Sequence, residues 1–171
     1  GQACQTAVKQ HGVAFLIDLH GHGHPDPRVE LGYLFNAAEL AVDEQELNGT
    51  AFVEKSSLRW LVEKRGLRHS DLLHGPISLG GLLEARGFPA TPSPGKPVPG
   101  LPFFRGGYTI ARHCQASAGV TGLQIEANRS RLRDTAANRL RFARALTAAL
   151  QTYFAQNLGM ELGKGGVPSS R

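Results

Sequence analysis

The stretch that decides the fold is Gly12–Pro25, which reads GVAFLIDLHGHGHP. Residues 13–19 are apolar except for one aspartate, and they lie between a glycine and a segment rich in glycine and proline. A short apolar run bounded in this way is typical of a buried strand in an α/β protein. We therefore predict a core strand over residues 13–19 that ends where three histidines begin.

These histidines would follow the carboxyl end of the predicted strand, which is where open α/β sheets bind their ligands. His20, His22 and His24 are separated by glycines, which leave room for a metal ion and its water. His20 is the first candidate for a metal ligand and His22 the second. Asp18 lies on the same side of a continuing strand as His20, so its carboxylate can orient an imidazole. The alternative is a polar loop in which His22 and His24 face solvent.

Length and composition favour one α/β domain over residues 1–160, followed by a flexible tail over residues 161–171. The chain has 171 residues, of which 41% are hydrophobic, enough for one buried core. No apolar run approaches the roughly 18–20 residues that span a bilayer, so we expect no membrane partner. Two cysteines exclude a disulfide-rich scaffold, and the net charge of +5 specifies no partner.

The rest of the chain alternates between extended and helical patterns. Six prolines between residues 89 and 102 predict an ordered loop that crosses a surface or covers a site. The apolar spacing in the last helix places Leu140, Ala143, Leu146, Leu150 and Phe154 on one face. The other predicted elements are an extended segment over 29–35, helices over 56–66 and 79–86, a turn and strand over 106–110, a strand over 121–126, and the last helix from 134 or 135 to 159.

Glu126, near the end of a predicted strand, is the candidate general base or acid. A carboxylate beside a metal-bound water can take its proton and pass it to a leaving nitrogen. The alternative is a structural glutamate paired with Arg129. By alternation, Glu126 lies on the strand face opposite Leu123 and Ile125.

Several residues near this strand are candidates for substrate contacts. An arginine, with Arg129 and Arg112 the first choices and Arg105 a third, can clamp a substrate carboxylate or stabilise an oxyanion. Gly107 is the second residue of a glycine pair, followed by Tyr108, and this pair allows the backbone to approach a ligand closely. His113, next to Arg112, completes the predicted substrate-binding residues.

Four blocks of sequence resemble the N-formylglutamate amidohydrolase family, in order and over about residues 1–155. The blocks are DLHGHGHP with ELGYL (18–25 and 30–34), GPISLGGLLEARGFPATPSP (75–94), GGYTIARH (106–113) and LQIEANRSRLR (123–133). The resemblance implies a zinc-carboxypeptidase-like fold, a three-layer α/β/α sandwich around a mixed sheet. It also implies zinc-dependent hydrolysis of the amide bond of a small-molecule N-acyl amino acid, with N-formylglutamate as the type substrate.

The resemblance also assigns roles to particular residues. His20 is similar to the zinc histidine that follows a core strand, and Glu126 is similar to the carboxylate that activates the zinc water. The other zinc ligands of the family, a histidine and an acidic residue, lie upstream of the DLHGH block, where this chain has no counterpart. The chain thus looks like the C-terminal part of such an enzyme. Within it, the candidates to complete the metal shell are His22, His24, Glu30, His69, His74 and His113.

Two other interpretations remain open. Histidines two residues apart also serve metal hydrolases built on TIM barrels, but such a barrel takes about 200 residues or more. A non-catalytic relative, or a basic module that uses the arginines between 129 and 144, is the alternative outside enzymes. Aromatic residues make up only 7% of the chain, and we see no RNA-binding motif, so nucleic acid is not an expected partner.

Overall fold

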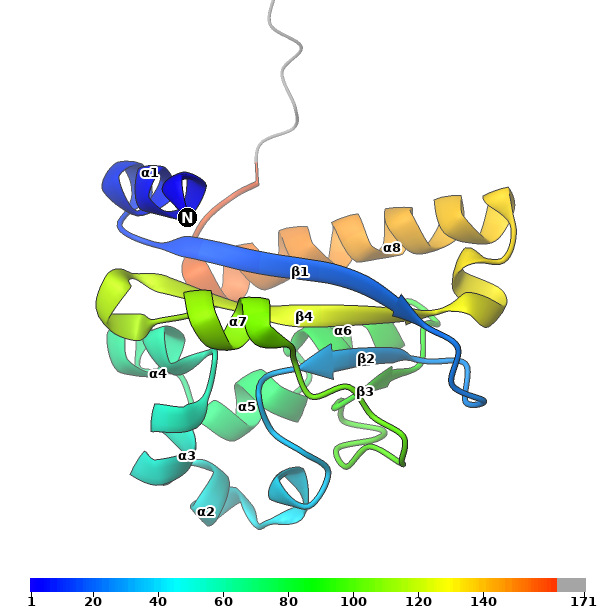
Figure 1. Cartoon of the computed structure of the whole chain (residues 1–171), viewed down its shortest axis with the longest axis horizontal. Coiled ribbons are helices and arrows are strands. Elements are labelled where there is room, and N and C mark those ends of the chain that lie inside the picture. The colour runs from blue at the N-terminus through cyan, green and yellow to red at the C-terminus, as the bar shows by residue number, and fades with distance from the viewer. Residues whose placement is uncertain (163–171) are drawn as a thin grey trace, which may run out of the picture.

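The computed structural model describes residues 1–162 and shows an α/β protein with a four-stranded mixed sheet (Figure 1). The strands are β1 (Ala14–His22), β2 (Val29–Gly32), β3 (Ala90–Thr91) and β4 (Val120–Asn128), in the order β1-β4-β2-β3. Strand β4 runs parallel to β1 and antiparallel to β2, and β3 is parallel to β2. The core strand expected after Gly12 therefore pairs with a strand about 100 residues later in the chain.

Eight α-helices surround the sheet in the described part of the chain. Figure 1 shows α8 on the far side of β1 and β4, and α7 on the near side. The helices are α1 (Gln2–His11), α2 (Glu44–Leu47), α3 (Thr50–Lys55), α4 (Arg59–Arg65), α5 (His69–His74), α6 (Leu79–Glu84), α7 (Tyr108–His113) and α8 (Ala136–Tyr153), with short helical segments η1 (Glu39–Ala41), η2 (Ala116–Ala118), η3 (Arg129–Arg133) and η4 (Phe154–Leu158).

The two faces of the sheet differ in chemistry. One face is apolar, and its Phe15 contacts Tyr153 of α8 and Phe154 of η4, with ring centroids 5.6 and 5.0 Å apart. The opposite face is polar. Residues in register on paired strands point to the same side, so polar side chains from all four strands lie together on this face. The side chains of this polar face are Asp18, His20 and His22 of β1, Gln124, Glu126 and Asn128 of β4, Glu30 of β2 and Thr91 of β3.

Several predicted elements are confirmed. Strands occupy 14–22, 29–32 and 120–128, and helices end near Gly66, Gly87 and Gly159, each of which has a positive φ. The last helix begins after Thr135, whose hydroxyl accepts a hydrogen bond from the Asn138 backbone N–H at 3.1 Å. The proline-rich segment 89–102 is an irregular loop except for β3, as expected.

Three expectations about the elements are wrong. The first strand continues through the histidines, because β4 pairs with it as far as His22. The strand expected near residue 110 is helix α7, because both edges of β4 are already paired and Ile110 is instead buried from a helix. In α8, Leu140 and Ala143 are exposed, and the buried face consists of Phe142, Leu146, Ala149 and Tyr153.

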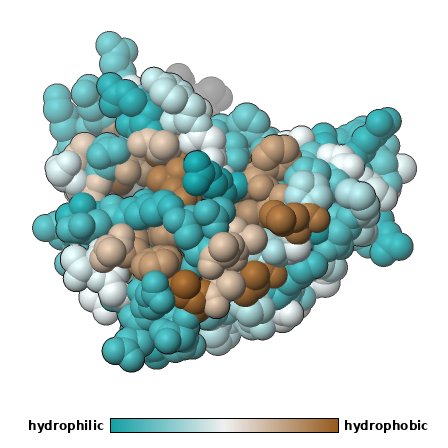
Figure 2. Space-filling model, turned by 60° about the horizontal axis from the view of Figure 1, so that its bottom comes forward, coloured by the Kyte–Doolittle hydropathy of each residue, from teal (hydrophilic) through white to brown (hydrophobic). Residues whose placement is uncertain are grey.

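The surface of the protein mixes hydrophobic and hydrophilic side chains. On the face shown in Figure 2, hydrophobic side chains gather in patches that hydrophilic side chains separate. None of the helices in residues 1–162 combines the length and the apolar character needed to cross a membrane. Of the tail predicted over 161–171, all but Glu161 and Leu162 lies outside the described residues.

Candidate metal centre

A row of three polar side chains crosses the middle of the polar face. His20 of β1 is in register with Glu126 of β4, and Glu126 is in register with Glu30 of β2. Since paired strands lie about 4.8 Å apart, the register places one imidazole and two carboxylates side by side. His20 and Glu126, far apart in sequence, are thus direct neighbours on one face of the sheet.

The imidazole of His20 is oriented by its own strand. Its Nε2 lies 2.9 Å from Oδ1 of Asp18, two residues earlier. A carboxylate only accepts hydrogen bonds, so Nε2 carries the proton and donates it to Asp18. The lone pair is then on Nδ1, and the half-exposed ring can use it to bind a cation.

The residue Glu126 is buried, and one of its carboxylate oxygens is buried without a partner among the described residues. The residue is 6% exposed, and the oxygen without a partner is Oε2. Burial raises the pKa of Glu126, the imidazoles of His20 and His24 oppose this rise, and the charge of Glu30 adds to it. A carboxyl group with a raised pKa holds a proton more readily than a free carboxyl group, which suits a residue that accepts and returns a proton.

A second group of possible ligands lies at the end of β1. One ligand atom from each of His22, His24 and Glu30 can be chosen so that all three lie within 4.8 Å of one another. Oε1 of Glu30 is 2.8 Å from Nδ1 of His24 and 3.9 Å from Nδ1 of His22. The side chains of His22 and Glu30 are fully buried, and that of His24 is 16% exposed. We refer to these three residues as the His22–His24–Glu30 cluster.

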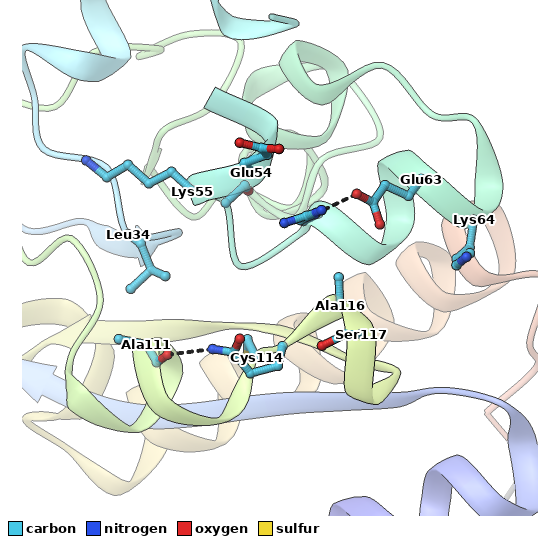
Figure 3. Close-up of a pocket in the computed structure, with 12 residues that line it drawn as sticks. Leu34, Glu54, Lys55, Glu63, Lys64, Ala111, Cys114, Ala116 and Ser117 are labelled. Atoms are coloured by element: carbon cyan, nitrogen blue, oxygen red, sulfur yellow. Dashed lines mark hydrogen bonds and ion pairs between the residues drawn. The ribbon is translucent and has the colours of Figure 1, made fainter. Parts of the chain in front are cut away.

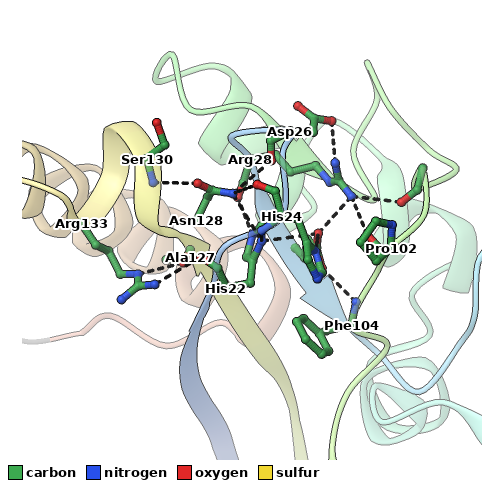
Figure 4. A network of polar contacts seen from close by, with 12 residues as sticks. His22, His24, Asp26, Arg28, Pro102, Phe104, Ala127, Asn128, Ser130 and Arg133 are labelled. Carbon is green, nitrogen blue, oxygen red and sulfur yellow. Dashed lines mark hydrogen bonds and ion pairs between the residues drawn. The ribbon is translucent and has the colours of Figure 1, made fainter.

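Hydrogen bonds from the β1–β2 connection, from Phe104 and from the end of β4 hold this cluster (Figure 4). His22 donates from Nε2 to the carbonyl oxygen of Arg28 at 3.0 Å, so its lone pair is on Nδ1. Burial lowers the pKa of His22, and the bond to the Arg28 carbonyl opposes this shift. The backbone N–H of Phe104 donates to Oε2 of Glu30 at 2.8 Å, and the Phe104 ring stacks on His24. His22 is thus a neutral, oriented imidazole.

Two neighbours of the cluster join it to the rest of the molecule. Arg28 places Nη2 3.0 Å from Oε1 of Glu30 and donates from the same nitrogen to the carbonyl oxygens of Gly100 and Pro102. Asn128 donates to the carbonyl oxygen of His24 at 2.7 Å, and its Oδ1 accepts from the Ser130 backbone. The proline-rich loop and the end of β4 therefore both contact the β1–β2 connection.

Of the candidate arginines, Arg129 lies beside His24 at the end of β4. Arg129 and His24 line one open depression of about 480 Å³ beyond the end of β4. Arg112 and His113 line another depression together with Val120, at the opposite end of β4 from Glu126. Six residues of strand separate Val120 from Glu126, a distance of roughly 20 Å.

Gly107 and Tyr108 lie at the start of α7, over the polar face. A Cβ on Gly107 would lie 3.2 Å from the side-chain nitrogen of Gln124, so a larger residue would crowd the sheet. Tyr108 is 79% exposed and, with Arg105 and Gly107, lines a depression of about 370 Å³. The side chain of Gln124, which Gly107 approaches, is two positions along β4 from the row of His20 and Glu126.

A further hollow lies away from the histidines (Figure 3). It measures about 340 Å³ and lies between α3, α4 and the segment from α7 to η2. Its Arg59 is paired with Glu63 at 2.6 Å, and Cys114 lies on the opposite wall. None of its lining residues is a histidine, so it does not extend the metal centre.

Arg28 and Phe104, which contact Glu30, were not predicted from the sequence. One signal was present, because Glu30 is an isolated acid in the otherwise apolar stretch VELGYLF. A buried carboxylate requires partners, and here Arg28 and His24 provide them. The identity of those partners depends on the β1–β2 connection and on a loop about 70 residues away.

Comparisons of this chain with protein-family models, with curated proteins and with solved structures found no match. The functional assignment therefore depends on the chemistry of the site and on the sequence blocks that form it.

Proposed function

We propose that this chain carries the catalytic face of a zinc-dependent amidohydrolase that cleaves the amide bond of an N-acyl amino acid such as N-formylglutamate. The observation that carries the proposal is the register of His20 with Glu126 on one polar face. The blocks DLHGHGHP and LQIEANRSRLR, which resemble the amidohydrolase family, form these two neighbouring strands. The proposed zinc ligand His20 and the proposed general base Glu126 are therefore adjacent.

The proposal includes the architecture that the resemblance implies, a three-layer sandwich of the zinc-carboxypeptidase type. It is supported by a mixed sheet that has α8 on one face and α7 on the other (Figure 1). The resemblance also places further metal ligands upstream of the DLHGH block. Those ligands would complete the metal shell around His20.

The residues of the row are suited to a zinc ion. Nε2 of His20 is held by Asp18, which leaves Nδ1 as the ligand atom, and the oriented imidazole is a common zinc ligand. The unpartnered Oε2 of Glu126 is a buried acceptor that lacks a donor. A bound zinc ion supplies Lewis acidity, which polarises a carbonyl group and lowers the pKa of a zinc-bound water.

The chain's own residues then have distinct roles in the proposed reaction. Glu126 accepts a proton from the attacking water at its carboxylate and donates it to the leaving nitrogen. Asp18 keeps the His20 ring in one orientation and one tautomer. Arg129, at the rim of the depression that His24 also lines, meets the carboxylate of the amino-acid product.

A second candidate function outside enzymes is a basic binding module. It is favoured by the exposure of Arg131, Arg139, Arg141 and Arg144 along η3 and α8. Binding of this kind weakens steeply with salt, because each arginine–phosphate contact releases counterions. A salt titration with a generic RNA separates this module from the hydrolase.

Replacement of Glu126 tests the hydrolase directly. In the complete enzyme, Glu126→Gln should lower kcat for N-formylglutamate by about 10²–10⁴-fold, because the amide cannot move the proton. The zinc content, measured by elemental analysis, should remain that of the wild type. Glu54→Gln, at an exposed position on α3, is the matched control and should keep full activity. Wild-type kcat in Glu126→Gln would remove Glu126 from the mechanism.

A further inference from the structure

We infer that the His22–His24–Glu30 cluster is a second metal site, separate from His20, that takes a transition-metal ion such as Zn²⁺ or Co²⁺. The inference does not depend on the hydrolytic function. It depends on the donor types, on their spacing and on the hydrogen bonds that already orient them. Two imidazoles and one carboxylate are a donor set that zinc and its neighbours prefer over magnesium or calcium.

The spacing of the donor atoms suits a tetrahedral ion. Ligand atoms at about 2.0–2.1 Å from a tetrahedral zinc lie roughly 3.3 Å from one another. Oε1 of Glu30 lies 2.8 Å from Nδ1 of His24 and 3.9 Å from Nδ1 of His22. Shifts of about half an ångström would therefore bring each of these two distances to the tetrahedral value.

The protonation of the cluster also suits a cation. Because Nε2 of His22 donates to a carbonyl oxygen, the lone pair is on Nδ1, which accepts only long hydrogen bonds, from the His24 backbone N–H at 3.2 Å and from the Asn128 side-chain amide at 3.4 Å. His24 donates from Nδ1 to Glu30, so binding a metal at Nδ1 requires the ring proton to move to Nε2. The ion then replaces this proton between the imidazole and the carboxylate.

Arg28 is the group that competes with a cation, and its hydrogen bonds limit this competition. Its Nη2 lies 3.0 Å from Oε1 of Glu30, yet the two hydrogens on Nη2 go to the carbonyl oxygens of Gly100 and Pro102. Its Nη1 donates to Asp26 at 2.6 Å. Oε1 of Glu30 thus keeps lone-pair capacity for a metal, and Arg28 stays bound to the proline-rich loop.

The geometry gives this site a structural role. Its three ligands come from the end of β1, from the β1–β2 connection and from β2, and Oε2 of Glu30 also binds the Phe104 backbone. A bound ion would fasten these segments together at the edge of the depression lined by His24. We therefore expect the metal to raise the thermal stability of the chain.

Titration of the chain with Co²⁺ tests this inference, because tetrahedral Co²⁺ has strong visible absorption. We expect one Co²⁺ per chain at this site, displaced by Zn²⁺, and a higher Tm with either ion. His24→Ala and Glu30→Gln should weaken binding by at least about tenfold, since even the loss of a supporting partner has an effect of that size. His11→Ala, at an exposed position on α1, should bind as the wild type does.

His20→Ala separates this site from the proposed catalytic one. It should retain the Co²⁺ absorption, because His20 is not part of the cluster. Equal loss in His20→Ala and His24→Ala would show a single shared site and would overturn the inference. Wild-type binding in a folded His24→Ala variant, or no Co²⁺ binding by the wild type, would also overturn it. An inactive enzyme that still binds Co²⁺ through His24 would count against the hydrolase alone.

Discussion

Burial lowers the pKa of two imidazoles in this protein, those of His22 and His69. His69 of α5 donates from Nδ1 to the carbonyl oxygen of Leu47 at 2.6 Å, and its Nε2 has no partner among residues 1–162. Burial lowers the pKa of His69, and the bond to Leu47 opposes this shift. Protonation would place an uncompensated charge in the core.

This burial makes the free energy of unfolding depend on pH. Because the pKa of His69 in the folded state lies below the unfolded value of about 6.5, the unfolded chain takes up the proton first as pH falls. Through His69, the free energy of unfolding is therefore highest above about pH 6.5 and decreases as the pH falls below that value. His69→Gln should therefore lose less stability between about pH 7.5 and 5.5 than the wild type. Urea unfolding midpoints at both pH values measure this difference. An equal loss of stability in the variant and the wild type would contradict the prediction.

At the scale of single elements, α8 shows that packing decides which apolar side chains contribute to stability. Leu146 is 9% exposed and joins the core, whereas Leu140 on the same helix is 53% exposed. Leu146→Ala should lower the free energy of unfolding by about 2–5 kcal/mol, because it leaves a cavity. Leu140→Ala, the same change on the open side, should stay within about 0.5 kcal/mol. Denaturant unfolding checks both, and similar effects would show that the helix packs in another rotation.

The same elements show what the sequence could and could not predict. The strand after Gly12 and the long last helix are local patterns, and both were predictable from apolar spacing and capping residues. Residues 108–113 carry Tyr, Thr and Ile, which favour strands, but β4 already has a neighbour on each edge. That information is not local. The adjacency of His20 and Glu126 has the same origin, since register between distant strands cannot be deduced from either strand alone.

At the scale of the whole molecule, Arg28 joins parts of the chain that are far apart in sequence. It is 4% exposed and connects Asp26 and Glu30 to the proline-rich loop. Arg28→Leu would leave the buried Glu30 without its cationic neighbour, and we expect a loss of about 3–5 kcal/mol in stability. Arg59→Leu breaks an exposed pair with Glu63 and should cost less than about 1 kcal/mol. Thermal unfolding of both variants compares them, and equal losses would refute the role of Arg28.

The position of β1 in the sheet determines where further polypeptide can join it. In residues 1–162, β1 pairs with β4 alone and is the outermost strand on its side. Its free backbone groups are a template for another strand. Any segment that adds there, from the same polypeptide or another one, extends the row of Glu30, Glu126 and His20 by one residue. If that incoming residue has a metal-binding side chain, it could bind the same ion as the imidazole of His20.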